Sequence, residues 1–296
     1  MLNLRFRLTQ PGVLIADGAT GTALQKACLP RGTAPESWNF ENPAAIRNLY
    51  RSYIQAGSDL ILTNSFGGTR ARLERDDLAD QVVEINRQAS ALAKEMAGDD
   101  VYVLGDIGPL GKLLSPLGPI KYDEAVTLFQ EQANGLFKGN VDGFLIETMA
   151  DLNEAKAAVD AVRKVADIPV LVTMSFDTHG FTMMGISPGQ AVKELSSLGV
   201  DVIGANCGRS LSETLTAIHT MRQTSPEAIL MAKPNAGLPR RITTEQGKAN
   251  ELIYDVTPEE MAQYALRYLE HGVKIFGGCC GTTSDHIQAI AKALKN

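Results

Sequence analysis

The stretch GFLIETMADLNEAKAAVDAVRKVADIPVLVTMSF, residues 143–176, contains the pattern that decides the fold. It begins with a short apolar run, Gly143–Met149, continues as an amphipathic helical pattern, Asn153–Ala166, and returns to a second apolar run, Val170–Phe176. Asp151 stands where a residue that caps the helix N-terminus is expected. Two near-continuous apolar strands joined by a helix predict parallel neighbours in a sheet that is covered on its outer side.

The same unit recurs along the whole chain of 296 residues. Eight apolar runs, each followed by a polar or glycine-rich turn, are found at Val13–Asp17, Leu60–Phe66, Val101–Ile107, Gly143–Met149, Val170–Phe176, Val202–Cys207, Ile229–Pro234 and Val273–Gly278. Eight evenly spread units predict an α/β protein with one domain over residues 1–296, a single (β/α)8 TIM barrel. A doubly wound open sheet is the alternative, but no G-x-G-x-x-G motif follows the first run.

The starts of the predicted helices carry residues that favour the N-cap position. These caps are predicted at Asp151, Ser187, Ser212, Thr257 and Ser284.

Charge and composition favour a protein that handles small molecules. The chain has 28 basic and 34 acidic residues, a net charge of −6, without the clustered Lys and Arg expected of a nucleic-acid-binding surface. No run approaches the roughly 18 apolar residues of a membrane span, and the N-terminus lacks the apolar core of a secretory signal. We therefore expect a cytoplasmic protein with reduced thiols and with neither nucleic acid nor membrane as a partner.

Polar residues gather at the ends of the predicted strands, where this type of barrel carries its active site. They include Asp17-Gly18-Ala19-Thr20, Thr63-Asn64-Ser65, Asp106, Glu147-Thr148, Asn206-Cys207, Pro234-Asn235 and Gly278-Cys279-Cys280. Three of the four cysteines thus follow only two strands, the sixth and the eighth.

These three cysteines are predicted to bind a metal ion, although free cysteine is often a small buried hydrophobe. Cys279 and Cys280 would point to opposite faces of a regular strand, but the flanking glycines permit a backbone that aims both sulfurs at one point. Together with Cys207 they offer three thiolates, a set that favours zinc or another thiophilic metal. None of the four histidines lies at a strand end, so the fourth ligand position is left for a substrate. For Cys28 no functional role is expected.

A metal held by three thiolates is poorly suited to activating water and well suited to accepting a thiol. Coordination lowers the pKa of an incoming thiol from about 8.5, so it is bound as the thiolate at neutral pH. This thiolate remains nucleophilic toward an alkyl carbon. The residues alone therefore predict S-alkylation of a substrate thiol.

The strand-end motifs resemble those of the zinc-dependent homocysteine S-methyltransferases. This family includes the homocysteine-binding module of cobalamin-dependent methionine synthase and betaine–homocysteine methyltransferase. The motifs that carry the resemblance, over essentially the whole chain, are Asp17–Thr22, Ala56–Asp59, Thr63–Phe66, Glu147-Thr148, Gly204–Cys207, Pro234–Pro239 and Gly277–Thr283. Tyr50, Ser65 and Ser284 depart from the family pattern, where His, Thr and Pro are common, but none is a proposed ligand.

The resemblance implies that Cys207, Cys279 and Cys280 bind Zn²⁺ and that the bound metal activates homocysteine for methylation to methionine. It also implies that Asp17 and Glu147 meet the ammonium group of the substrate, which suits carboxylates. Backbone amides of the turn from Gly18 to Thr22 are placed to take the carboxylate, as helix N-termini do for anions. The substrate-binding residues that we predict are Asp17, Gly18, Thr20, Glu147, Asn206 and Asn235, with Asn235 also helping to organise the metal pocket.

Three classes of methyl donor are compatible with the sequence. These are a separate methyl-corrinoid (cobalamin) protein, a small sulfonium compound such as S-methylmethionine or S-adenosylmethionine, and betaine, which needs an aromatic cage. Only one tryptophan, Trp38, is present for such a cage. We favour the corrinoid protein, mainly because the chain has no evident donor-specific insertion. Two segments, 108–122 and 237–255, are expected to shape access for the donor.

Two functions of a different kind remain open at this point. The chain could methylate a thiol other than homocysteine, or it could bind zinc or thiols without catalysis. The carboxylates Asp17 and Glu147 argue for binding of an amino acid and against mere storage.

Overall fold

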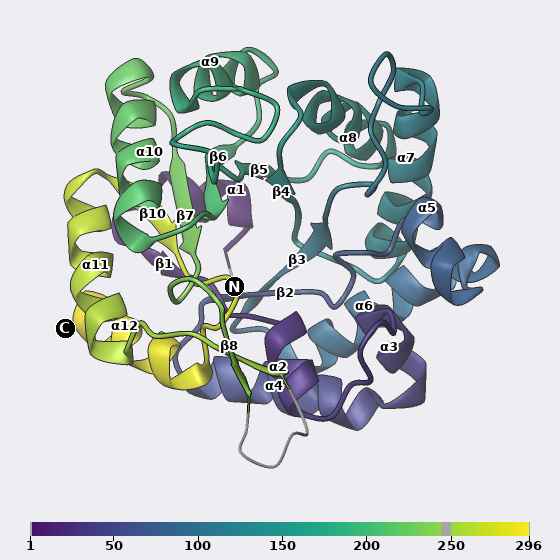
Figure 1. Ribbon diagram of the computed structural model, residues 1–296, viewed down its shortest axis with the longest axis horizontal. Helices are drawn as coiled ribbons and strands as arrows, with labels where there is room; N and C mark the ends of the chain where they lie inside the picture. The colour runs from purple at the N-terminus through teal and green to yellow at the C-terminus, as the bar shows by residue number, and fades with distance from the viewer. Residues whose placement is uncertain (1, 244–249, 296) are drawn as a thin grey trace.

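Eight parallel strands curl into one barrel with helices around it, as Figure 1 shows for a computed structural model that describes residues 2–243 and 250–295. The strands are β1 (Leu14–Ile15), β2 (Leu60–Leu62), β3 (Tyr102–Ile107), β4 (Gly143–Met149), β5 (Val170–Met174), β6 (Val202–Cys207), β7 (Leu230–Pro234) and β10 (Val273–Phe276). Their order is β1-β10-β7-β6-β5-β4-β3-β2. A parallel bridge between Ala16 and Leu60 joins the first and last strands of this order. The predicted (β/α)8 barrel is confirmed.

Alternate residues of the strands fill the interior of the barrel, because side chains along a strand point to opposite faces in turn. The apolar interior cluster contains Leu14, Ala16, Leu60, Leu62, Tyr102, Leu104, Leu145, Leu171, Val202, Met231 and Ile275. The short helix α1 (Leu4–Thr9) adds Leu4 and Leu8 to this cluster. The same alternation continues toward the C-terminal ends of the strands at Asn64, Asp106, Glu147, Asn206 and Lys233. Along these strands, the side chains that face the barrel interior therefore change from apolar to polar near the C-terminal end.

The outer face of the barrel is covered by a ring of amphipathic helices. They are α4 (Pro43–Gln55), α6 (Val82–Ala97), α7 (Tyr122–Lys138), α8 (Leu152–Val165), α9 (Pro188–Ser197), α10 (Leu211–Thr224), α11 (Pro258–Glu270) and α12 (Ser284–Lys295). Their buried faces meet the outward residues of the strands in the larger apolar core. Shorter helices, α2 (Gly21–Lys26), α3 (Trp38–Glu41) and α5 (Arg70–Leu73), and three short 3-10 segments follow β1 and β2.

Three of the predicted helix caps are confirmed by their hydrogen bonds. The side chains of Asp151, Ser187 and Thr257 accept backbone N–H groups at the starts of α8, α9 and α11. The prediction for α10 is wrong by two residues, because the cap is Ser210, which accepts the N–H of Glu213, and not Ser212. The prediction for α12 is wrong by one residue, because Ser284 is the first residue of the helix and not the residue before it.

A small antiparallel hairpin, absent from the prediction, follows β7 within segment 237–255. Its strands are β8 (Arg240–Thr243) and β9 (Asn250–Ile253). Residues 244–249 of the segment lie outside the described part of the chain. Across the two described ranges, no helix combines the length and apolarity needed to cross a membrane.

Candidate metal centre and substrate site

The three predicted cysteine ligands converge at the C-terminal end of the barrel. Cys207 ends β6, whereas Cys279 and Cys280 follow β10, and the three Sγ atoms lie within 4.8 Å of one another. The Sγ atoms of Cys207 and Cys279 are 3.0 Å apart, and all the cysteines are free thiols. Tetrahedral zinc with Zn–S bonds of about 2.3 Å places two sulfurs about 3.8 Å apart. The three converging thiols therefore form a donor set that fits one zinc ion, and the Cys207 and Cys279 sulfurs would move apart on binding it.

Unusual backbone conformations bring the sulfurs together. Cys207 has a positive φ of 56°, and the glycines that follow the two cysteine sites, Gly208 and Gly281, have φ values of 75° and 81°. A non-glycine residue in the left-handed region is uncommon and costs about 1–3 kcal/mol, so it persists only where the surrounding structure fixes it. A Cβ at position 281 would also lie 2.1 Å from the ring of Tyr254. Gly281 is thus required for the loop that carries Cys279 and Cys280.

Asn206 links the cysteines to the neighbouring strands. Its Oδ1 accepts the backbone N–H of Thr148 at 2.9 Å and the hydroxyl of Thr173 at 2.8 Å. Its Nδ2 donates to Thr148 Oγ1 at 2.6 Å and lies 3.7 Å from Cys207 Sγ and 3.9 Å from Cys279 Sγ. Asn206 therefore connects the cysteine cluster to strands β4 and β5.

Asn235 braces the turn that contains Cys207. Its side-chain Nδ2 donates to the carbonyl of Gly208 at 2.9 Å, and its backbone N–H donates to the carbonyl of Cys207 at 3.2 Å. The Oδ1 atom of Asn235 is buried without a hydrogen-bond partner in the described structure.

The loop after β1 is tied directly to the cysteine loop. The Tyr53 hydroxyl lies 2.8 Å from the carbonyl of Ala19 and 3.0 Å from that of Thr282. The N–H of Ala19 donates to the same Thr282 carbonyl at 3.0 Å. A Cβ at Gly18 would lie 2.7 Å from Thr282 O and 2.8 Å from the Tyr53 ring. The predicted substrate loop, residues 17–22, therefore packs directly against the predicted metal loop, residues 277–283.

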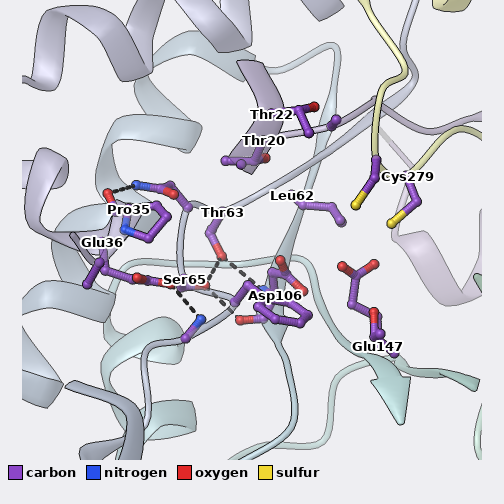
Figure 2. Close-up of a pocket in the computed structure, with 18 of the residues that line it drawn as sticks. Thr20, Thr22, Pro35, Glu36, Leu62, Thr63, Ser65, Asp106, Glu147 and Cys279 are labelled. Carbon is purple, nitrogen blue, oxygen red and sulfur yellow. Dashed lines mark hydrogen bonds between the residues drawn. The ribbon is translucent and has the colours of Figure 1, made fainter. Parts of the chain in front are cut away.

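A cavity of about 500 Å³ opens beside the three sulfurs. Figure 2 shows it extending from Cys279 and Glu147, past Asp106 and Ser65, to Pro35 and Glu36. Among the predicted site residues, those that line it are Gly18, Thr20, Glu147, Cys207, Cys279 and Cys280. Asp17, Asn206 and Asn235 are not in its lining.

The inner end of the cavity concentrates buried charge. Lys233, 2% exposed, places its Nζ 3.3 Å from Asp17 Oδ1 and 3.6 Å from Glu147 Oε2. Burial lowers the pKa of Lys233, but the Glu147 and Asp17 carboxylates outweigh this effect and hold the pKa above its ordinary value. Burial also raises the pKa of Glu147 to about 7 against the opposing attraction of Lys233. For Asp106, burial and then repulsion from Glu147 raise the pKa well above the ordinary value.

Lys233 was not among the site residues predicted from the sequence. One feature of the sequence did indicate its position. Lys233 stands two residues after Met231 in an apolar run, so the alternation of side chains along a strand places both on the same face. Asp106 was recognised as a polar strand end but was not assigned a role.

The outer end of the cavity has a different character. It is lined by Pro35, Glu36, Phe66, Arg72 and Arg75. The Arg72 guanidinium lies 5.8 Å from the centroid of the Phe66 ring, and Phe66 is the one aromatic residue of the described lining. Trp38 is buried in the core instead. Segments 108–122 and 237–255 contribute no residue to the described lining.

Comparison with known proteins agrees with this geometry. The family model for homocysteine S-methyltransferase matches residues 14–294. The chain is 33% identical to methionine synthase of Mycobacterium leprae over 302 residues, 95% of this chain and 24% of that protein. It is 34% identical to methionine synthase of Mycobacterium tuberculosis over 303 residues, 96% of this chain and 25% of that protein. It thus spans about a quarter of the length of these curated relatives.

Solved structures show the same fold. The metallated form of the homocysteine methyltransferase MmuM from Escherichia coli is 20% identical with a TM-score of 0.81, over 98% of this chain and 99% of that one. A methyltransferase from Methanosarcina mazei is 11% identical with a TM-score of 0.62, over 99% and 98% of the two chains. The extent of the family match and the identity to the methionine synthases show that the chain belongs to the homocysteine S-methyltransferase family.

Proposed function

We propose that the chain transfers a methyl group to the sulfur of homocysteine and so forms methionine. The observation that carries the proposal is the convergence of the Cys207, Cys279 and Cys280 sulfurs on a cavity that Glu147 also lines. In this proposal the cysteines hold Zn²⁺, which when bound supplies a Lewis acid that keeps the substrate thiol ionised at neutral pH. The chain's own residues bind the amino-acid part of the substrate and fix its orientation.

The proposed orientation follows from the two sides of the inner cavity. Glu147 offers a carboxylate to the substrate ammonium, while the turn containing Gly18 and Thr20 offers backbone amides to the substrate carboxylate. The amide of Ala19 is excluded because it already donates to Thr282. Asp17 acts indirectly, by pairing with Lys233. Asn206 and Asn235 hold the backbone that carries the cysteines in place.

For the methyl donor we propose a methyl-corrinoid carried by a separate protein or domain. The cavity lining supports this choice over betaine, because a quaternary ammonium is bound by several aromatic faces and the described lining provides one, that of Phe66. The similarity to methionine synthases about four times as long is compatible with a donor that is delivered by another unit.

The donor assay uses zinc-loaded protein and homocysteine, with methylcobalamin or a methyl-corrinoid protein, S-methylmethionine, S-adenosylmethionine and betaine tested separately. Methionine is expected with the corrinoid donor and should be lost in Cys207→Ala. Cys28→Ala is the matched control, because Cys28 is exposed and outside the metal cluster. Metal analysis should show bound zinc in the control and a large loss of zinc affinity in Cys207→Ala. Unchanged zinc affinity in Cys207→Ala would refute the three-cysteine site, and methionine from betaine or a sulfonium donor alone would refute the corrinoid assignment.

A further inference from the structure

The three cysteine sulfurs lie at the same cavity as the substrate sulfur of the proposed reaction. Cys207, Cys279 and Cys280 all line this cavity, and all are only partly buried. As metal ligands they are thiolates, and a thiolate is chemically able to take a methyl group from the donor. Methylation of a cysteine would remove one anionic ligand. A durable enzyme therefore has to make its own sulfurs poorer nucleophiles than the sulfur of its substrate.

Two of the three sulfurs have an amide donor beside them. Asn206 Nδ2 lies 3.7 Å from Cys207 Sγ and 3.9 Å from Cys279 Sγ. A side-chain amide has two hydrogens, and Thr148 Oγ1 accepts one of them at 2.6 Å, which leaves the other for the sulfurs. Asn206 is outside the described cavity lining, so this donor serves the protein's sulfurs and not one that enters from the cavity.

The third sulfur has a hydroxyl donor, which comes from Tyr254. This hydroxyl donates to the sulfur of Cys280. The ring of Tyr254 packs against the backbone of the next residue, because a Cβ at Gly281 would lie 2.1 Å from the Cγ atom of the ring. Tyr254 is half-buried and, like Asn206, is outside the described cavity lining. Each of the three protein sulfurs thus has a side-chain donor beside it.

Hydrogen bonds of the neighbouring backbone hold Tyr254 in this position. Val256 donates its N–H to the Ala236 carbonyl at 3.1 Å, and Ala236 donates its own N–H to the Cys280 carbonyl at 2.9 Å. The Val256 carbonyl accepts Nε2 of His286 at 2.9 Å. The segment that carries Tyr254 is therefore tied to the cysteine loop and also to α12.

Building on the proposed function, we propose that Tyr254 is a specificity-determining residue, whose hydrogen bond makes Cys280 a poorer nucleophile and so directs the methyl group to the substrate sulfur. In the productive step the substrate thiolate bonds to the methyl carbon while the bond from that carbon to the donor's leaving atom breaks, and the electron pair of the broken bond stays with that atom. The competing displacement has Cys280 Sγ as the nucleophile and yields a thioether. A sulfur that bonds to carbon gives up the charge that attracts the Tyr254 hydroxyl, so the hydrogen bond opposes this step.

The test treats zinc-loaded protein with methyl iodide, a methyl donor that needs no partner protein, and follows methylation of each cysteine by tandem mass spectrometry. In Tyr254→Phe, Cys280 should be methylated about tenfold faster than in the unmodified protein, the effect of one hydrogen bond to a charged group. The rates at the other two cysteines should change little. Tyr122→Phe is the matched control, because it removes a hydroxyl that donates to a carboxylate, Asp160 Oδ2 at 2.7 Å, outside the cysteine cluster.

A spectroscopic measurement tests the hydrogen bond without any methylation. In cobalt-substituted protein, the sulfur-to-cobalt charge-transfer absorption should move to longer wavelength in Tyr254→Phe, because the thiolate lone pair loses the hydrogen bond that stabilises it. With homocysteine and a methyl donor present, the number of methionines formed for each methylated Cys280 should fall about tenfold in the same variant.

Several outcomes would overturn the inference. One is an equal rate of Cys280 methylation in Tyr254→Phe and Tyr122→Phe, and another is an unchanged charge-transfer absorption. A rise of equal size at all three cysteines, or loss of zinc from Tyr254→Phe at saturating zinc, would also overturn it, because Tyr254 would then hold the loop and not select the nucleophile. Failure of the proposed function is distinguishable, because the unmodified protein would then form no methionine, whereas methyl iodide would still show the difference at Cys280.

Discussion

Removal of one hydroxyl group, in Tyr53→Phe, should loosen the connection between the substrate loop and the metal loop. This hydroxyl lies 2.8 Å from the Ala19 carbonyl and 3.0 Å from the Thr282 carbonyl, and Tyr53 is 1% exposed. Its single proton is shared by two carbonyls. In the variant the Thr282 carbonyl keeps only the N–H of Ala19, and the Ala19 carbonyl has no other hydrogen-bond donor among the described residues. The expected cost is about 1–3 kcal/mol in unfolding free energy, the range for buried polar groups that lose a partner. In a chain of this size that corresponds to a fall of roughly 2–10 °C in Tm.

The zinc affinity gives the functional part of the prediction. Thr282 is two residues after Cys280, so a loosened Thr282 carbonyl should disturb the cysteine loop. Loss of a group that supports metal ligands commonly reduces affinity by about 10–100-fold, and we expect about tenfold here. Tyr50→Phe is the matched control, because the buried Tyr50 hydroxyl accepts the N–H of Asn64 at 2.8 Å and has no bond to the cysteine loop.

Competition with a chromophoric chelator measures the zinc dissociation constant, and thermal denaturation of the same samples measures stability. Both variants should lose stability, but only Tyr53→Phe should lose zinc affinity. The reasoning would be refuted by the same zinc dissociation constant in the two variants. It would also be refuted by a Tyr53→Phe protein as stable as the unmodified one.

Three further perturbations test other parts of the structure. Gly18→Ala should reduce homocysteine and zinc affinity, since its Cβ would lie 2.7 Å from Thr282 O, whereas Gly21→Ala has nothing within 4 Å and should behave as the unmodified protein in calorimetric binding. Glu154→Gln should remove a pH dependence of stability. Burial raises the pKa of Glu154 to about 7, so the folded protein holds this proton to a higher pH than the unfolded chain does. The free energy of unfolding of the unmodified protein therefore falls as pH rises from about 4.5 to about 7. Between pH 4 and pH 8, the unfolding free energy of the unmodified protein should therefore fall by about 3 kcal/mol more than that of the variant, at about 1.36 kcal/mol per pKa unit. Urea denaturation measures both, and equal falls in the two proteins would contradict this. Chelation should lower the Tm of zinc-loaded protein, because zinc binds the folded state, and an unchanged Tm would show that the metal contributes nothing to stability.

The fold was predictable because its signal is local. Each strand–helix unit has its own apolar run and amphipathic pattern, as in residues 143–176, and eight such units leave few ways to close a parallel sheet. Finer boundaries were less well determined. Ser210 and Ser212 both suit the cap of α10, and only the folded structure shows that the Ser210 hydroxyl accepts the N–H of Glu213.

The convergence of Cys207, Cys279 and Cys280 was predictable for a chemical reason. Few residue types bind zinc, and adjacent cysteines among glycines cannot both face one side of a regular strand, so Cys279 and Cys280 indicate an irregular loop from sequence alone. The roles of Asp17 and Asn206 depend instead on tertiary contacts. In the sequence, each is a polar residue at a strand end with no evident partner. In the structure, the Asp17 carboxylate accepts hydrogen bonds from Leu62 and Lys233, and the Asn206 side chain accepts hydrogen bonds from two threonines.

The buried charges connect these two levels of prediction. A lysine near the end of an apolar run is easily taken for a side chain that extends its ammonium to water, and Lys233 gave no other local signal. Once Leu104, Leu145 and Met231 are known to face the barrel interior, however, alternation sends Asp106, Glu147 and Lys233 into the same space. The charge pattern of the site thus follows from strand register, which no single strand reveals. Its consequence is electrostatic, since Lys233 Nζ then lies 3.3 Å from Asp17 Oδ1 and 3.6 Å from Glu147 Oε2 in the barrel interior.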